Sequence, residues 1–180
     1  MHRTAVLKFM ALPSQTQVLI IGAGAAGLMC AATAGQCGRA VVVVDHANKV
    51  GKKILMSGGG RCNFTNMDVL PKNYLSDNTH FCKSALARYT QWDFIALVQK
   101  HQIPYHEKKL GQLFCDNKAQ DILSMLLDEC AQAGADIHTL CDIEQVTALA
   151  ESDLPMRYKV KTSQGMIYCE SLVIATGGLS

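Results

Sequence analysis

The sequence predicts an α/β fold that begins with a strand, a helix and a second strand in a βαβ unit. An apolar run at 18–21 ends at glycine, as is typical of a strand buried on both faces. Residues 27–36 are rich in Ala, Leu and Met, which favour a helix, and Gly35 and Gly38 can end it. Residues 40–44 are apolar and β-branched, so they predict the second buried strand. The crossover in such a unit is nearly always right-handed.

The middle of the chain predicts a long loop followed by two helices. Residues 49–66 are rich in Gly, Lys and Asn, and loops of that length in a compact domain are usually functional or disordered. Residues 84–102 predict a helix with an uneven apolar face, and residues 103–115 predict a turn with short strands. Residues 118–133 predict an amphipathic helix that ends at Gly134.

The last third of the sequence predicts strands. Apolar and β-branched runs at 136–149, 157–162 and 166–174 indicate a small β-meander, with 163–165 as a hairpin turn. The run at 172–175 is of the fully buried type and leads into a Thr-Gly-Gly turn. The whole pattern is that of a Rossmann-like domain, and we expect it to be truncated before its second half.

Composition limits the classes of partner. The chain has 180 residues, is 49% hydrophobic and carries a formal net charge of +2 from 17 basic and 15 acidic residues. Binding through phosphates usually needs a concentrated basic face, and bases need aromatic platforms, which are few here. We therefore expect a small-molecule substrate and no nucleic-acid partner.

Eight cysteines occur without a C-x-x-C pair, and most lie in apolar segments. A secreted disulfide framework is denser and lies in loops, so this pattern indicates reduced thiols in a cytoplasmic protein. Paired Cys/His spacing is missing as well, so we expect no metal site. The oligomeric state cannot be inferred.

The segment 18–35 could also be taken for a signal peptide or a membrane span, because it is long and nearly uncharged. Four glycines interrupt it, and a second apolar strand follows without a polar break, so we expect no membrane association. Residues 1–16 are expected to be a disordered lead without function, and 17–180 the incomplete nucleotide-binding domain.

The motif G-A-G-A-A-G at 22–27 stands between a predicted strand and a predicted helix, as a dinucleotide fingerprint requires. Gly22 permits the tight turn, Gly24 lets the backbone approach a diphosphate, and Gly27 lets helix and strand pack closely. Asp45 follows Gly27 by eighteen residues and can accept hydrogen bonds from both ribose hydroxyls, which would repel the 2′-phosphate of NADP. The alternatives are a ligand-free glycine turn and, for Asp45, a strand-end cap.

A second glycine-rich run, S-G-G-G-R-C-N at 57–63, favours FAD over NAD alone. Consecutive glycines can direct backbone N–H groups at the longer tail of FAD, and together the two loops predict a site for one elongated dinucleotide. Arg61 could contribute charge to the diphosphate or an acidic substrate, and Lys52 either does the same or is solvated. Cys62 could be a redox thiol beside the flavin, but packing is the favoured interpretation because no partner cysteine lies nearby in the sequence.

The turn Ala175-Thr176-Gly177-Gly178 follows a buried strand and is a further sign of a dinucleotide site. Flavin enzymes often return a strand beside the first βαβ unit and place such a turn near the diphosphate. The alternative is an ordinary glycine turn at a strand end.

These three motifs closely resemble the HI0933-like (YhiN/BaiN) family of FAD-dependent, NAD(P)-linked flavoprotein oxidoreductases. The resemblance covers about 18–180, and its most specific part is G-K-K-I-L-M-S-G-G-G-R-C-N-F-T-N at 51–66. It implies a fold of the glutathione-reductase type, FAD as cofactor and NAD(P)H as a possible electron donor. It also implies that the backbone of Val146 contacts adenine. The implied FAD contacts at matching positions are Gly22, Gly24, Ala26, Gly27, Asp45, Lys52, Ser57, Gly58, Gly59, Gly60, Arg61, Cys62, Asn63, Val146, Ala175, Thr176 and Gly177.

The expected function is therefore the FAD-binding portion of an enzyme that transfers hydride or electrons to or from a small organic substrate. Two alternatives stay open: a flavoprotein of nucleic-acid modification, and a non-catalytic nucleotide-binding fragment. A methyltransferase would leave the run at 57–63 unexplained. The sequence names no catalytic acid or base.

Overall fold

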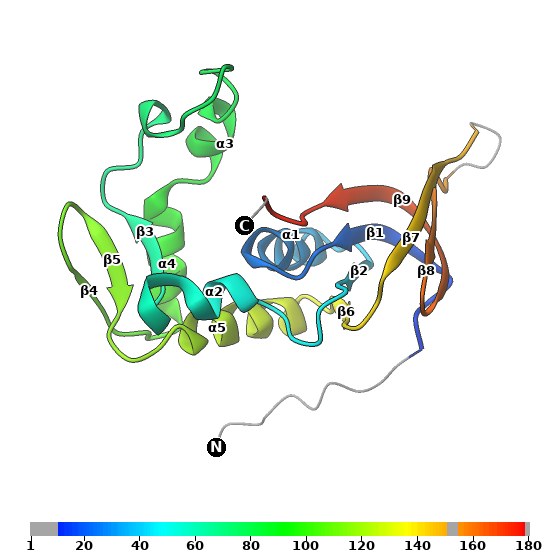
Figure 1. Cartoon of the computed structure of the whole chain (residues 1–180), viewed down its shortest axis with the longest axis horizontal. Coiled ribbons are helices and arrows are strands. Elements are labelled where there is room, and N and C mark those ends of the chain that lie inside the picture. Colours follow the sequence, from blue (N-terminus) through cyan, green and yellow to red (C-terminus); the bar gives the residue numbers. More distant parts are fainter. Residues whose placement is uncertain (1–10, 151–154, 179–180) are drawn as a thin grey trace. The chain divides into compact units, whose positions relative to one another are not determined.

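The computed structural model describes residues 11–150 and 155–178, which fold into two compact units. Unit 1 comprises residues 1–50 and 130–180, and unit 2 comprises 51–129 (Figure 1). Most of the predicted lead, residues 1–10, lies outside the described residues.

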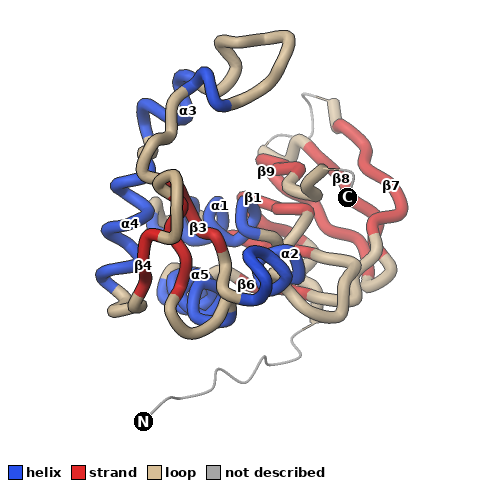
Figure 2. The backbone as a smooth tube through the Cα atoms, turned by 60° about the vertical axis from the view of Figure 1, so that its left-hand side comes forward, coloured by secondary structure: helices blue, strands red, loops and turns tan. Residues whose placement is uncertain are grey.

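Unit 1 is a six-stranded sheet with the order β6-β2-β1-β9-β8-β7. β1 lies between β2 and β9 and is parallel to both, and β2 is parallel to β6. β9, β8 and β7 form an antiparallel meander (Figure 2). The elements are β1 (Gln15–Ile21), α1 (Ala25–Gln36), β2 (Val41–Val44), β6 (Asp136–His138), β7 (Ile143–Ala148), β8 (Tyr158–Thr162) and β9 (Gly165–Ile174). The α/β class, the parallel sheet and the meander are therefore confirmed.

The centre of this sheet is buried on both faces, as its apolar composition predicts. Leu19 and Ile20 point to opposite sides of β1, and both are fully buried. β2 is buried along its whole length, and α1 turns Leu28 and Ala31 to the interior. Burying a large aliphatic side chain contributes about 1.5–3 kcal/mol, so these strands hold unit 1 together.

Two boundaries in unit 1 differ from the sequence prediction. β1 begins at Gln15, so its first two residues come from the predicted lead. The predicted strand at 136–149 is two strands, because the chain leaves β6 after His138 and pairs again only in β7. Leu140 takes a left-handed conformation, φ +55°, at that break, and its N–H donates to the Ala47 carbonyl.

Unit 2 combines helices with a three-stranded antiparallel sheet of the order β3-β5-β4. The Phe64 ring on β3 lies against Phe94, with centroids 6.0 Å apart, and against Tyr105 at 5.5 Å. Its elements are α2 (Lys52–Met56), η1 (Ser57–Gly60), β3 (Asn63–Asn66), η2 (Pro71–Asn73), α3 (Lys83–Arg88), α4 (Gln91–Lys100), β4 (Tyr105–Glu107), β5 (Gln112–Cys115) and α5 (Gln120–Gln132), whose last three residues belong to unit 1.

The prediction of one loop at 49–66 is wrong, because that segment forms α2, η1 and β3. The predicted helix at 84–102 is broken between α3 and α4 for a local reason. The Thr90 hydroxyl accepts from the Asp93 N–H, and the Asp93 carboxylate accepts from the Thr90 N–H at 2.7 Å. This capping box starts a new helix inside the predicted one. The amphipathic helix and the short strands at 103–115 are confirmed.

Glu129 makes a testable contribution to stability. Its Oε1 lies 2.8 Å from Lys100 Nζ and 2.7 Å from His101 Nε2, and its side chain is 4% exposed. These hydrogen bonds, led by Lys100, hold the pKa of Glu129 below its usual 4.5. Such a carboxylate stabilises the fold above its unfolded-state pKa, and the stabilisation is lost as the pH falls through the folded-state pKa.

We expect Glu129→Gln to lower the free energy of unfolding at neutral pH by about 1–3 kcal/mol. The difference from the wild type should shrink as the pH falls below the unfolded-state pKa and through the lower folded-state pKa, where the wild-type carboxylate becomes protonated too. Urea denaturation across this pH range measures it. Glu144→Gln is the matched control, since Glu144 forms a 2.7 Å pair with Lys161 that is about half exposed, and solvent screening makes such a pair contribute little to stability. Equal losses in both variants at neutral pH would contradict the assignment.

Candidate dinucleotide-binding site

The glycine turn after β1 is packed against the turn after β9. Gly22 has φ +110°, and a Cβ there would overlap the Ala175 carbonyl. A Cβ on Gly27 would overlap the Gly22 carbonyl, so α1 can approach the turn only with glycine at that position. Gly22 and Gly27 are therefore required by the protein's own backbone, as the fingerprint predicts.

Gly24 differs from these two glycines because it faces open space. It has an ordinary φ of −84°, and a Cβ there would meet no heavy atom within 4 Å. Gly24 is the N-cap residue of α1, and because it lacks a side chain it caps none of the helix N–H groups. The first turn of the helix, all of which is described, contains no acidic residue. The partial positive charge at this end of the helix suits an external anion such as a diphosphate.

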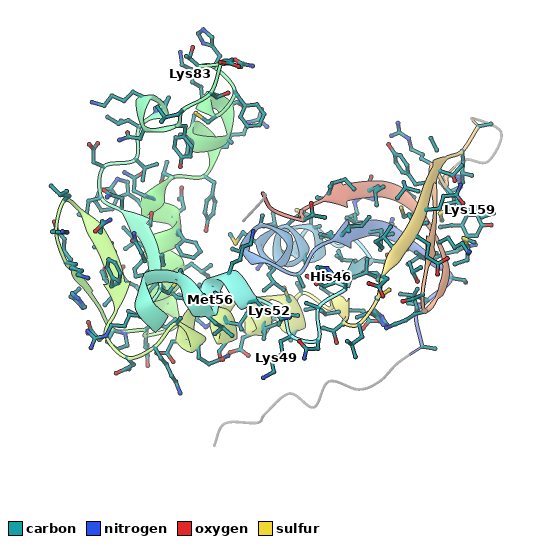
Figure 3. All side chains as sticks on the ribbon, in the orientation of Figure 1. His46, Lys49, Lys52, Met56, Lys83 and Lys159 are labelled. Atoms are coloured by element: carbon teal, nitrogen blue, oxygen red, sulfur yellow. The ribbon has the colours of Figure 1, made fainter. Side chains whose placement is uncertain are left out.

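Asp45 joins the end of β2 to the glycine turn. Its Oδ2 accepts a 2.7 Å hydrogen bond from the Ala23 N–H, and its Oδ1 accepts one of 2.8 Å from the Ala47 N–H. The side chain is 15% exposed. A carboxylate offers about four acceptor positions, so ribose hydroxyls could still bind to the two that remain. The strand-end cap and the ribose acceptor are compatible roles. Figure 3 shows His46 and Lys49 on the segment that follows.

The turn at 175–177 continues β9 alongside β1. The Ala175 N–H donates to the Ile21 carbonyl at 2.8 Å, and Gly177 has φ +78°. The structure thus brings Gly22, Asp45 and Ala175 together at the carboxyl ends of three neighbouring parallel strands. In open α/β sheets this is where ligands bind.

Val146 is not among the residues brought together. It lies in β7, and β8 and β9 separate β7 from β1. The segment that reaches the Asp45 turn is 140–141: the Cys141 N–H donates to the Asp45 carbonyl at 2.9 Å. Sequence reasoning missed this segment because it predicts one strand over 136–149, and nothing in the sequence marks the left-handed turn at Leu140. An adenine contact at Val146 stays a prediction.

The second glycine-rich run, in unit 2, has a defined shape. Gly58, Gly59 and Gly60 have φ of +57°, +66° and +87°. A Cβ on Gly58 would lie 2.7 Å from Phe114 Cε1, whereas Gly59 and Gly60 face open space. The Gly60 carbonyl accepts from the Ala119 N–H at 2.7 Å, which anchors the run. Gly58 is thus required for packing, and Gly59 and Gly60 leave backbone accessible.

The side chains in and beside the run at 57–63 differ in their exposure to solvent. Lys52, Arg61 and Asn63 are exposed. The Ser57 hydroxyl donates to the Ile54 carbonyl at 2.8 Å, so it is engaged locally. Cys62 is 5% exposed, and burial raises the pKa of its thiol. A thiol with a raised pKa is a poor nucleophile, which favours packing over a redox role for Cys62.

The described residues contain no group of three or more His, Cys, Asp or Glu side chains that could hold a metal ion. Over the same part of the chain, every helix is too short or too polar to cross a membrane.

Comparison with known proteins places the whole of this pattern in one family. The model of the HI0933-like protein Rossmann domain matches residues 16–180. The ribosomal RNA dihydrouridine synthase of Escherichia coli (strain K12) is 57% identical over 162 residues, which are 90% of this chain and 39% of the relative. The 3-dehydro-bile acid delta(4,6)-reductase of Clostridium scindens is 24% identical, and the match covers 88% of this chain and 38% of the length of the reductase. The chain spans about two fifths of the length of these relatives.

A solved structure shows the same fold at low sequence identity. THI4 of Thermovibrio ammonificans superimposes with a TM-score of 0.61 at 15% identity, covering 91% of this chain and 58% of that one. The predicted resemblance to the HI0933-like family is confirmed, and with it the Rossmann fold.

The open space at Gly24 separates cofactor binding from folding. We expect Gly24→Ala to keep the wild-type free energy of unfolding to within about 0.5 kcal/mol, because its φ suits alanine. Its affinity for FAD should fall about tenfold or more, since the methyl group occupies the approach to the helix N-terminus. Flavin fluorescence titration and urea denaturation measure the two quantities.

Gly27→Ala is the matched control and should behave in the opposite way. Its Cβ overlaps the Gly22 carbonyl, so overpacking should destabilise the fold by about 1–3 kcal/mol or more. If Gly24→Ala bound FAD as tightly as the wild type, the helix N-terminus would not be the diphosphate site.

Burial predicts which thiols react. Cys37 is exposed, whereas burial raises the pKa of Cys62, that of Cys115 to about 12 and that of Cys169 to about 11. Iodoacetamide at about pH 8 should label Cys37 quickly and the other three only after unfolding, because thiolate is the reactive form. Peptide mass spectrometry reads out each site. Labelling of Cys62 as fast as Cys37 in the folded protein would restore the redox interpretation.

Proposed function

Because this chain belongs to the HI0933-like Rossmann family, we propose that it is the FAD-binding part of an oxidoreductase that reduces uridine in ribosomal RNA. The supporting observation is the 57% identity to a protein named ribosomal RNA dihydrouridine synthase. The proposal takes up the alternative of nucleic-acid modification and replaces the expectation of a small-molecule substrate without a nucleic-acid partner.

The residues of unit 1 suit the adenosine diphosphate part of FAD. The uncapped N-terminus of α1 at Gly24 offers N–H groups to the diphosphate, and the free acceptor positions of Asp45 suit the ribose. A 2′-phosphate on that ribose would meet the Asp45 carboxylate, so NADP is disfavoured at this position. The role of the run at 57–63 toward the flavin stays a prediction from the sequence.

FAD, when bound, supplies hydride chemistry that amino-acid side chains cannot perform. The net reaction would add a hydride and a proton across a carbon–carbon double bond of uridine, at the expense of NAD(P)H. Unit 1 contributes orientation, since it would fix one end of the cofactor through backbone groups of a turn that Gly22 and Gly27 hold in place. We also propose a cytoplasmic location, in line with eight free thiols.

A second candidate is the reduction of a double bond in a small organic substrate. The relative named 3-dehydro-bile acid delta(4,6)-reductase supports it, at 24% identity. Both candidates share the flavin chemistry and differ in the acceptor.

The test uses the FAD-loaded protein, NADPH or NADH, and ribosomal RNA that lacks dihydrouridine. We expect reduced nicotinamide to bleach the flavin and dihydrouridine to appear in the RNA, read by mass spectrometry of its nucleosides. Gly24→Ala, which should fold normally, should lose product in proportion to its lost FAD. Turnover of a small conjugated ketone with no change in the RNA would favour the second candidate. If neither NADPH nor NADH bleached the bound flavin, the chain would be a nucleotide-binding protein without oxidoreductase activity.

A further inference from the structure

The segment 67–90 of unit 2, between β3 and α4, has no core of its own. All of its residues are described, and none of them is buried. Figure 1 shows this segment, which contains η2 and α3, in green beyond α4. We call residues 67–90 the excursion. A segment of this length with no buried residue usually carries function.

The excursion is nevertheless held in a defined shape. Its ends are joined where Gln91 Nε2 donates to the Met67 carbonyl at 3.0 Å. Inside it, the Leu70 N–H donates to Asn73 Oδ1 at 3.0 Å, and the His80 N–H donates to Asn78 Oδ1 at 3.1 Å. The side chains that it presents are therefore ordered by local hydrogen bonds rather than by burial.

Large apolar side chains of this segment face solvent. Phe81 is 79% exposed and Leu75 is 97% exposed. The exposed set is Met67, Leu70, Tyr74, Leu75, Phe81 and Tyr89, and Trp92 follows just beyond it on α4. So many large apolar side chains exposed on one segment suit a binding surface.

Cations are interspersed with these rings. Lys72, Lys83 and Arg88 are exposed, and no ion pair within the described residues involves any of them. Lys83 Nζ lies 3.0 Å from His80 Nδ1, and Figure 3 shows Lys83 on the excursion. The acidic residues of the segment are Asp68 and Asp77. Unpaired cations beside exposed rings suit a polyanion with stacking faces.

We propose that residues 67–90 bind unpaired nucleotides of ribosomal RNA, with Tyr74 and Phe81 stacking on bases and Lys72, Lys83 and Arg88 contacting phosphates. The inference rests on the proposed function and adds to it the surface that would recognise the RNA. RNA is favoured over an apolar protein partner because the exposed rings alternate with unpaired cations, and a purely apolar partner would leave those cations unused.

A Phe81 series tests the stacking. Affinity for a fluorescein-labelled, uridine-rich single-stranded RNA is measured by anisotropy with the FAD-loaded protein. We expect Phe81→Leu and Phe81→Ala each to weaken binding about tenfold, because stacking on an aromatic is worth about 1–3 kcal/mol per base. Phe81→Tyr should bind like the wild type. Leu110→Ala is the matched control and should bind like the wild type, since Leu110 is 85% exposed, has no ring and lies outside residues 67–90.

The cations are tested through the salt dependence of the same affinity. Lys83→Gln should reduce the slope of log K against log salt by about 0.7, as the loss of one phosphate contact on a single strand requires. Lys159→Gln, on β8 of unit 1, should leave the slope unchanged (Figure 3). Flavin content checks that each variant is folded.

The outcomes separate this inference from the proposed function. Wild-type affinity in Phe81→Leu together with a loss in Phe81→Ala would show that an apolar contact, not stacking, holds the RNA, and would overturn the stacking assignment. Wild-type affinity in the Phe81 and Lys83 variants, together with dihydrouridine formation, would overturn the inference and leave the proposed function standing. A wild-type protein that neither binds RNA nor forms dihydrouridine would overturn both.

Discussion

The site in unit 1 depends on backbone packed directly against backbone. Gly27 lets α1 meet the Gly22 carbonyl, and Gly22 in turn lies against the Ala175 carbonyl. These contacts bring a turn from the start of the chain and one from its far end to the same edge of the sheet. A side chain at either glycine would push the turns apart by more than a hydrogen bond tolerates. The position of the helix N-terminus relative to β9 follows from this packing.

Asp45 extends the same constraint to the third strand. Because its two oxygens accept from Ala23 and Ala47, the carboxylate fixes both the glycine turn and the turn after β2. A group that is held by the protein and still has free acceptor positions is ordered before a ligand arrives. Less entropy is then lost on binding, so a modest number of contacts can hold a nucleotide.

Sequence reasoning succeeded where the signal is local and failed where tertiary contacts decide. The glycines at 22 and 27 were assigned correctly because a strand, a tight turn and a helix leave few conformations to the chain. The helix break at Thr90 was missed although the sequence Thr-x-x-Asp indicates a capping box, because the apolar pattern continues on both sides of Thr90. The contact of Leu140 with Ala47 has no sequence signal, since a left-handed leucine is required only by the path between β6 and β7.

The expectation that no nucleic acid binds came from an average over the chain, and charged and aromatic residues are not spread evenly over the two units. Unit 1 has seven basic and seven acidic residues, whereas unit 2 has ten and eight, so the whole net charge of +2 belongs to unit 2. Aromatic content is low overall, but Tyr74 and Phe81 stand exposed on one short excursion. Phosphates interact with the charged side chains within a screening length of about 8–10 Å, so the local charge matters more than the net charge of the chain. A nearly neutral protein can therefore present a surface suited to RNA, provided that its cations are unpaired where its rings are exposed.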